Sequence, residues 1–280
     1  MIIGKLYNYI IYRIWRLYSL MFRKFVLDIH LADHCNLNCK SCNHYSPLAE
    51  PAFRDLKRLN DDLTVLGKFW NSFKTIRLLG GEPLLNPQIT EAVDIVRRHF
   101  PTINIEIVTN GILLGNNNII KEDFWNVCRK GHVTLAVTEY PIAVNYDKIR
   151  VLCLEKSVKL RFFENRCYGN SFNYYKLNPK GTEPTRQYYE CVENSCLQLR
   201  EGRLFSCAPA AYVEFLNKKF NVDFKIRNKD FLNLSSVQSS FDIRKFLLHK
   251  KPFCSYCVFP RKSFRWERSN KKADEWIEVM

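Results

Sequence analysis

The chain has 280 residues, and 46% of them are hydrophobic, which is enough for a sizeable core and excludes an intrinsically disordered protein. Its formal net charge of +15 favours anionic partners, such as phosphorylated substrates, nucleic acid or an anionic membrane surface. A solvated basic surface without such a partner explains the charge equally well. The number of cysteines, 11, is odd and excludes complete intramolecular disulfide pairing.

Residues 1–24 are predicted to form a basic amphipathic helix. Lys5, Arg16 and Arg23 fall on one side of a helical wheel, while Ile3 and Ile10 fall on the other. We expect the apolar side to pack against the protein, with contact to an anionic membrane surface as the alternative. The segment has neither the ~20 uncharged residues of a membrane span nor the pattern of a signal peptide. We therefore expect a cytoplasmic protein, free or peripheral at the membrane, whose thiols stay reduced.

From residue 25 onward, short apolar strands alternate with amphipathic helices. Strands are expected at 25–31, 75–80, 103–110, 132–140 and 158–164, and helices at 56–73, 89–100, 119–129 and 145–156. Such alternation predicts a parallel sheet covered by helices. Five units fit a partial barrel better than a complete eight-unit one. The predicted fold class is therefore α/β, with a partial (β/α)6 TIM-type barrel over residues 25–165.

Residues 166–280 lose this rhythm and are predicted to form a small cysteine-rich α+β extension. Residues 165–190 are rich in Asn, Tyr, Gly and Pro and indicate a loop. Residues 197–207 predict two short strands about a Glu201-Gly202 turn, and short helices are expected near 208–219, 241–250 and 271–279. An extension of this size has little core of its own, so a metal cross-link would stabilise it.

Three cysteines form a C-x3-C-x2-C motif directly after the first predicted strand: Cys35, Cys39 and Cys42. Structural zinc normally takes four ligands, and so does a complete iron–sulfur cube. Three closely spaced cysteines therefore suggest a cube with one iron left open. The alternative is zinc, with His34 or His44 as the fourth ligand.

Two further motifs end the next two strands. A GGEP segment contains Gly80, Gly81 and Glu82, and glycine lets the backbone approach a ligand closely. Alone, GGEP would indicate no more than a tight turn. VTNG, at 108–111, ends the third strand. All three motifs fall at the carboxyl ends of parallel strands, where α/β folds build their sites.

Together, C-x3-C-x2-C, GGEP and VTNG resemble the radical S-adenosylmethionine (SAM) enzymes over about residues 25–165. The resemblance implies that the three cysteines hold a catalytic [4Fe–4S] cluster whose open iron binds SAM. Reductive cleavage of SAM then yields a 5'-deoxyadenosyl radical, which removes a hydrogen atom from the substrate. Apart from the cluster, no catalytic residue is assigned.

The same resemblance assigns SAM contacts. It implies that Gly80, Gly81 and Glu82 bind the amino group of SAM. Asn110 and Thr138, at the next two strand ends, are candidates for its ribose or carboxylate. Glu164 and Arg166, after the fifth strand, face the same rim and are secondary candidates.

One position departs from the family pattern. Ser41 stands before the third cysteine, where the family usually has an aromatic or large apolar residue. We expect His44 or Tyr45 to compensate near the adenine.

A second set of cysteines lies in the tail: Cys191, Cys196, Cys207, Cys254 and Cys257. The spacing Cys191-x10-Gly202-x4-Cys207, followed by a C-x2-C, resembles the SPASM and twitch extensions of some radical SAM enzymes. Since no cysteine follows Cys257, the tail resembles the shorter twitch type with one auxiliary [4Fe–4S] cluster. Cys196 either replaces Cys191 as a ligand or lies beside the cluster. A zinc ribbon is the alternative for this set.

The remaining cysteines are isolated. Cys128 and Cys153 fall on predicted helices and are expected to be small core residues, and the role of Cys167 is open.

A fully ligated second cluster would accept an electron from a substrate radical. We therefore expect a net two-electron oxidation of a small polar, sugar-like substrate, with a flavodoxin- or ferredoxin-type reductant. Peptide-modifying members often carry an N-terminal domain, and the ~24 residues before the first strand are short for one. Alternatives are a peptide-maturation enzyme, a tRNA-modifying enzyme, a non-enzymatic iron–sulfur electron carrier and a zinc-containing nucleic-acid-binding protein. GGEP argues against the last two, and nucleic acid is not the expected partner.

Overall fold

The computed structural model describes residues 25–71, 73–115, 120–163, 171–182, 191, 193 and 196–278. The helix predicted at 1–24 lies outside these described residues, as do Glu164, Arg166 and Cys167. Within the described part, none of the helices is long and apolar enough to span a membrane.

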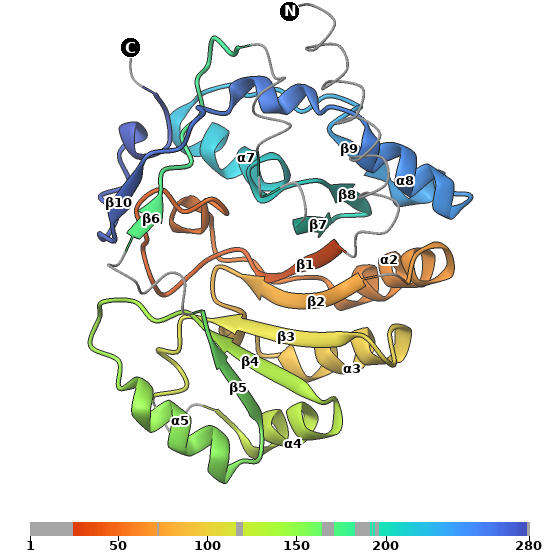
Figure 1. The fold of residues 1–280 in the computed structure, drawn as a ribbon, viewed down its shortest axis with the longest axis vertical. Helices are drawn as coiled ribbons and strands as arrows, with labels where there is room; N and C mark the ends of the chain where they lie inside the picture. The colour runs from red at the N-terminus through yellow and green to blue at the C-terminus, as the bar shows by residue number, and fades with distance from the viewer. Residues whose placement is uncertain are drawn as a thin grey trace, which may run out of the picture.

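A single mixed sheet of eight strands organises the molecule, in the order β5-β4-β3-β2-β1-β7-β8-β9 (Figure 1). Its strands are β1 (Phe25–Ala32), β2 (Phe73–Gly80), β3 (Asn104–Thr109), β4 (Val133–Val137), β5 (Lys159–Phe162), β7 (Cys196–Arg200), β8 (Arg203–Phe205) and β9 (Phe231–Asn233). The pairs from β5 to β7 are parallel, whereas β8 and β9 pair antiparallel at the edge. The predicted α/β class and the first five strands are confirmed, while the barrel closure and the domain boundaries stay predictions.

Four helices connect the successive parallel strands: α2 (Leu56–Phe69), α3 (Ile89–His99), α4 (Glu122–Lys130) and α5 (Tyr146–Glu155). In Figure 1, α2, α3 and α4 lie one after another beside β2, β3 and β4. Helix α2 begins where the Asp55 carboxylate accepts a hydrogen bond from the Arg58 backbone, 3.0 Å away. Apolar residues at helical spacing, such as Leu59 and Leu63, then join the buried side chains of β1 and β2 in one core.

The C-terminal part adds helices α7 (Ala208–Phe220) and α8 (Ser240–Leu248), as predicted, and a separate ribbon of β6 (Ser171–Asn173) and β10 (Ser263–Arg265). Short 3-10 turns are η1 (Ser46–Leu48), η2 (Pro83–Leu85), η6 (Leu234–Ser236), η7 (Pro252–Tyr256) and η8 (Ala273–Glu275). Strand β7 is the first strand of the predicted 197–207 hairpin, and it pairs with β1. It therefore extends the parallel sheet instead of lying in a separate unit.

The helix predicted at 271–279 is wrong, because only the single turn η8 forms there. The backbone beyond it pairs with Leu177 instead: the Leu177 N–H donates to the Trp276 carbonyl at 2.8 Å, and the Glu278 N–H donates to the Leu177 carbonyl at 2.9 Å. The Trp276 side chain is fully buried, and its indole N–H donates to the Cys42 carbonyl at 3.0 Å. This tertiary contact anchors the end of the chain on the first cysteine loop.

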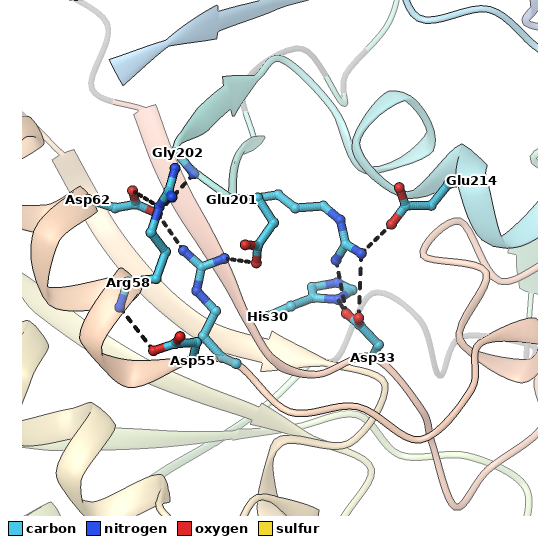
Figure 2. A network of polar contacts seen from close by, with 10 residues as sticks. His30, Asp33, Asp55, Arg58, Asp62, Glu201, Gly202 and Glu214 are labelled. Carbon is cyan, nitrogen blue, oxygen red and sulfur yellow. Dashed lines mark hydrogen bonds and ion pairs between the residues drawn. The ribbon is translucent and has the colours of Figure 1, made fainter. Parts of the chain in front are cut away.

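A polar network joins the β7–β8 turn to helix α2 (Figure 2). Arg54 contacts Asp62 at 2.5 Å and Glu201 at 2.9 Å, and the Gly202 backbone N–H donates to Asp62 at 3.1 Å. Asp62 is only 4% exposed, and Arg58 adds a third donor to its carboxylate at 3.1 Å. Asp62 is therefore the shared acceptor that fastens the edge of the sheet to α2.

Replacing Asp62 with Ala is expected to lower the free energy of unfolding by about 3–5 kcal/mol, because the buried Arg54 then loses its buried charge partner and keeps only the exposed Glu201. The neighbouring Asp61 is exposed, and Asp61→Ala should change stability by no more than about 0.5 kcal/mol. Urea unfolding followed by circular dichroism measures both variants. Equal stability of the two variants would contradict the anchoring role of Asp62.

Candidate functional site

The carboxyl ends of β1 to β4 open into one cavity of about 410 Å³. Its lining contains the three cysteines of the C-x3-C-x2-C motif and four of the five predicted SAM-contact residues: Cys35, Cys39, Cys42, Gly80, Gly81, Asn110 and Thr138. The fold therefore brings together side chains that are about 100 residues apart in sequence. Glu82 is the one predicted contact that does not line the cavity.

Gly80 and Gly81 press the end of β2 against the backbone that leads to Cys35. Gly80 has φ +143°, and a Cβ there would lie 2.1 Å from the Ala32 carbonyl oxygen. A Cβ on Gly81 would lie 2.0 Å from the His34 carbonyl oxygen, and the Gly81 N–H donates to Ala32 at 2.8 Å. The sequence predicts close approach to a ligand, whereas the structure shows close approach to the cysteine loop itself.

Glu82 is fully buried behind this contact, and its carboxylate joins β2 to β3. It accepts hydrogen bonds from the Thr109 hydroxyl at 2.7 Å, the Asn110 N–H at 3.0 Å and the Leu84 N–H at 3.1 Å. Burial raises the pKa of Glu82 to about 7, and these three donors oppose that shift. The carboxylate thus fixes the backbone of Asn110, which does line the cavity.

Asn110 ties the third strand to the cysteine loop. Its side-chain amide donates to Asn36 at 2.8 Å and lies 3.8 Å from the Cys35 sulfur. The Leu37 N–H also donates to that sulfur, at 3.3 Å. Burial, followed by the charge of Glu82, raises the pKa of the Cys35 thiol.

Ser41 is the position that departs from the family pattern, and His44 and Tyr45 are the residues expected to compensate for it. The three side chains lie in different surroundings. The Ser41 hydroxyl accepts a hydrogen bond from the Tyr175 N–H at 2.8 Å, so this small residue anchors the tail at the cavity. His44 lines the cavity and hydrogen-bonds His30, with 2.6 Å between His44 Nδ1 and His30 Nε2. Tyr45 is fully buried in a separate apolar cluster and does not line this cavity.

Sequence reasoning missed a polar pair on the floor of the cavity. Asp28 of β1 lies in register with Arg77 of β2 and with Gln198 of β7. Arg77 donates to both Asp28 oxygens, at 2.6 and 2.7 Å, and Gln198 donates to the same carboxylate at 2.8 Å. The sequence could have indicated this pair, because Asp28 and Arg77 each stand inside an apolar predicted strand, FVLDIHL and TIRLLG. A charge buried in such a strand requires a partner.

Further lining residues come from the segment after β4, from β6 and the residues that follow it, and from the segment before β7. Tyr140 and Phe172 stack with ring centroids 5.7 Å apart, and both line the cavity. The Tyr175 hydroxyl donates to Glu193 at 2.6 Å, and both of these residues line it too. The cavity therefore combines aromatic surface with hydrogen-bonding groups.

A second, smaller cavity is lined by Cys191, Cys207, Cys254 and Cys257, whereas Cys196 lines the first cavity. Of the two candidates, it is therefore Cys191 that lies with the other three. Arg261 donates to the Cys191 sulfur at 3.3 Å, and Lys251 lines the same cavity.

In the described part of the chain, no three His, Cys, Asp or Glu side chains are arranged to hold a single metal ion. Cys128 and Cys153 are each 1% exposed, as predicted for core residues, and burial raises the pKa of their thiols to about 12 and about 11.

Comparison with known proteins matches residues 29–137 to the family described as the Radical SAM superfamily. The 7,8-dihydro-6-hydroxymethylpterin dimethyltransferase of Methanocaldococcus jannaschii is 31% identical over 99 residues, which are 34% of this chain and 19% of that protein. GTP 3',8-cyclase of Microcystis aeruginosa is 36% identical over 93 residues, which are 32% of this chain and 28% of that protein. The chain thus spans less than a third of the length of either relative.

Among solved structures, BtrN in complex with AdoMet and 2-DOIA is similar with a TM-score of 0.52 and 14% identity. The likeness covers 85% of this chain and 94% of that chain, and at this identity it shows a shared fold.

Replacing Gly81 with Ala is expected to lower the free energy of unfolding by about 1–3 kcal/mol, because the Cβ meets backbone atoms that cannot rotate away. Because the backbone must move away from the new Cβ, the substitution should also displace the Cys35 loop and reduce the iron that the protein takes up on reconstitution. Gly115→Ala is the matched control, since its Cβ would meet nothing closer than 3.6 Å. Urea unfolding and iron content test the pair, and wild-type values for Gly81→Ala would refute the close-packing argument.

Proposed function

We propose that this chain, a radical SAM enzyme by its domain match and its relatives, carries out a two-electron oxidation of a small polar, sugar-like substrate. One observation carries the proposal: the cavity that contains the first three cysteines shares the wall residue Glu193 with the cavity of the second four. A substrate in the first cavity would thus lie next to both cysteine sets.

The donor set of the first cavity fits the group that the family uses. Three thiols on one short loop leave one position of a [4Fe–4S] cube free for SAM. When bound, the cluster and SAM supply the 5'-deoxyadenosyl radical that begins the reaction. The protein's part is to hold this site: Gly81 and Asn110 fix the loop of Cys35, and Thr138 lines the far side.

The cysteines of the second cavity fit a fully ligated cluster by their number. Four cysteines line it, which is the full ligand number for a [4Fe–4S] cube. The guanidinium of Arg261 contacts the Cys191 sulfur and compensates the negative charge that four thiolates would bring. Because no ligand position would be left for substrate, electron acceptance is the role proposed for this site. The second cluster and the twitch likeness of residues 166–280 are parts of the proposal.

The first cavity suits an uncharged, hydroxylated ring. Asp28 and Arg77 neutralise each other, so the floor offers hydrogen bonds with little net charge. Glu193 and Asn173 add polar groups, and the Phe172 ring offers a surface for the apolar face of a sugar or cyclitol. The surplus of basic residues that gives the net charge of +15 then lies outside this cavity.

A nucleotide-linked form of such a substrate is the second candidate. The relatives named GTP 3',8-cyclase favour it, as does the basic surface, which attracts phosphate groups. The same surface suits an acidic flavodoxin- or ferredoxin-type electron donor. Peptide and tRNA substrates, a cytoplasmic location and membrane contact through residues 1–24 stay predictions.

The reaction class is tested by anaerobic reconstitution with iron and sulfide, followed by SAM, dithionite and a panel of sugars, cyclitols and nucleotide sugars. Wild type is expected to form 5'-deoxyadenosine with at least one of these compounds, and the Cys35→Ala/Cys39→Ala/Cys42→Ala variant is expected to form none. Cys254→Ala/Cys257→Ala should still cleave SAM but should not complete oxidation of the substrate. Chromatography with mass detection measures both products. Cleavage of SAM by the triple variant, or an iron-loaded wild type that is inactive throughout the panel, would contradict the proposal.

A further inference from the structure

Tyr45 lies between the two cysteine sets. It follows Cys42 by three residues, and its backbone adopts φ +54°, an uncommon conformation for a tyrosine. The side chain is fully buried in an apolar cluster with Phe253. Cys207 and Cys257 of the second set pack against the same cluster. A residue on the first cysteine loop is therefore packed beside the second site.

The Tyr45 hydroxyl is buried and has no hydrogen-bond partner among the described residues. Burying a hydroxyl without a partner costs about 1–3 kcal/mol, so such a group calls for an acceptor. Burial raises the pKa of Tyr45, and the charges of Cys257, Cys207 and Cys42 raise it further, in that order. The thiols that act on the hydroxyl thus belong to both cysteine sets, and the two from the second set act more strongly than Cys42.

Arg261 also contacts the second set. Its guanidinium donates to the Cys191 sulfur at 3.3 Å and lies 4.5 Å from the centre of the Tyr175 ring. Tyr175 lines the first cavity, and Arg261 lines the second. The wall between the cavities therefore holds a cation in contact with a predicted ligand.

We infer that Tyr45 and Arg261 donate hydrogen bonds to the cluster that the second cysteine set would hold and that together they raise its reduction potential. This inference rests on the proposed function, which supplies that cluster. Reduction adds negative charge to the sulfurs, and a donor or a cation in contact stabilises the reduced form more than the oxidised form. Burial strengthens the effect, because water does not screen the charges. The two residues would thus make the second site an electron acceptor.

The experiment uses the Cys35→Ala/Cys39→Ala/Cys42→Ala chain, which retains only the second set, reconstituted with iron and sulfide. A redox titration with dithionite, followed by electron paramagnetic resonance, gives the midpoint potential. Tyr45→Phe keeps the ring and removes only the hydroxyl, and Arg261→Gln removes the cation. Both variants are expected to titrate at a lower potential than the parent, and Arg261→Lys should recover part of the shift.

Tyr174→Phe and Arg265→Gln are the controls, because neither residue lines the second cavity, and both should keep the parent potential. Iron-loaded Tyr45→Phe and Arg261→Gln proteins that also keep it would overturn the inference and leave the proposed function standing. A parent chain that takes up no iron and sulfide would overturn the second cluster and, with it, this inference.

Discussion

The contact between the end of β2 and the loop after β1 is the constraint on which the site depends. Gly80 and Gly81 let two backbone segments meet at a distance where a Cβ would lie about 2 Å from a carbonyl oxygen. This contact sets where Cys35 begins its loop, and Glu82 and Asn110 extend the arrangement to β3. The C-terminal segment closes the loop from the other side, through Trp276.

Three acidic residues at key positions of the fold are each paired with an arginine. Asp28 with Arg77 forms the cavity floor, Asp62 with Arg54 fastens α2, and Asp33 with Arg200 holds the approach to Cys35, 3.0 Å apart (Figure 2). Removing one member of such a pair leaves a costly unpaired charge, which makes the arrangement specific. At the cavity, the Asp28–Arg77 pair therefore adds hydrogen-bonding groups with little net charge. A site of this kind favours polar over strongly charged substrates.

Local sequence pattern was sufficient for the elements from β1 to β5 and for the three motifs at their ends, since each depends on neighbouring residues. Which of Cys191 and Cys196 lies with the second set could not be predicted locally, because the sequence around both is irregular. The pairing of β7 with β1 is a tertiary contact, and it places Cys196 at the first cavity. The pairing of Asp28 with Arg77 depends on strand register across 49 residues. The failed helix at 271–279 shows the same limit, since a contact with distant Leu177 replaced local hydrogen bonds.

We propose that two separate cysteine sets each hold an iron–sulfur cluster, one in the substrate cavity and one next to it. The most direct measurement is the iron, acid-labile sulfide and zinc content of three anaerobically reconstituted proteins: wild type, the variant without Cys35, Cys39 and Cys42, and the variant without Cys254 and Cys257. We expect two clusters in wild type and one in each variant, with no bound zinc. Zinc retained by wild type in place of iron, or the same iron content in all three proteins, would contradict this proposal.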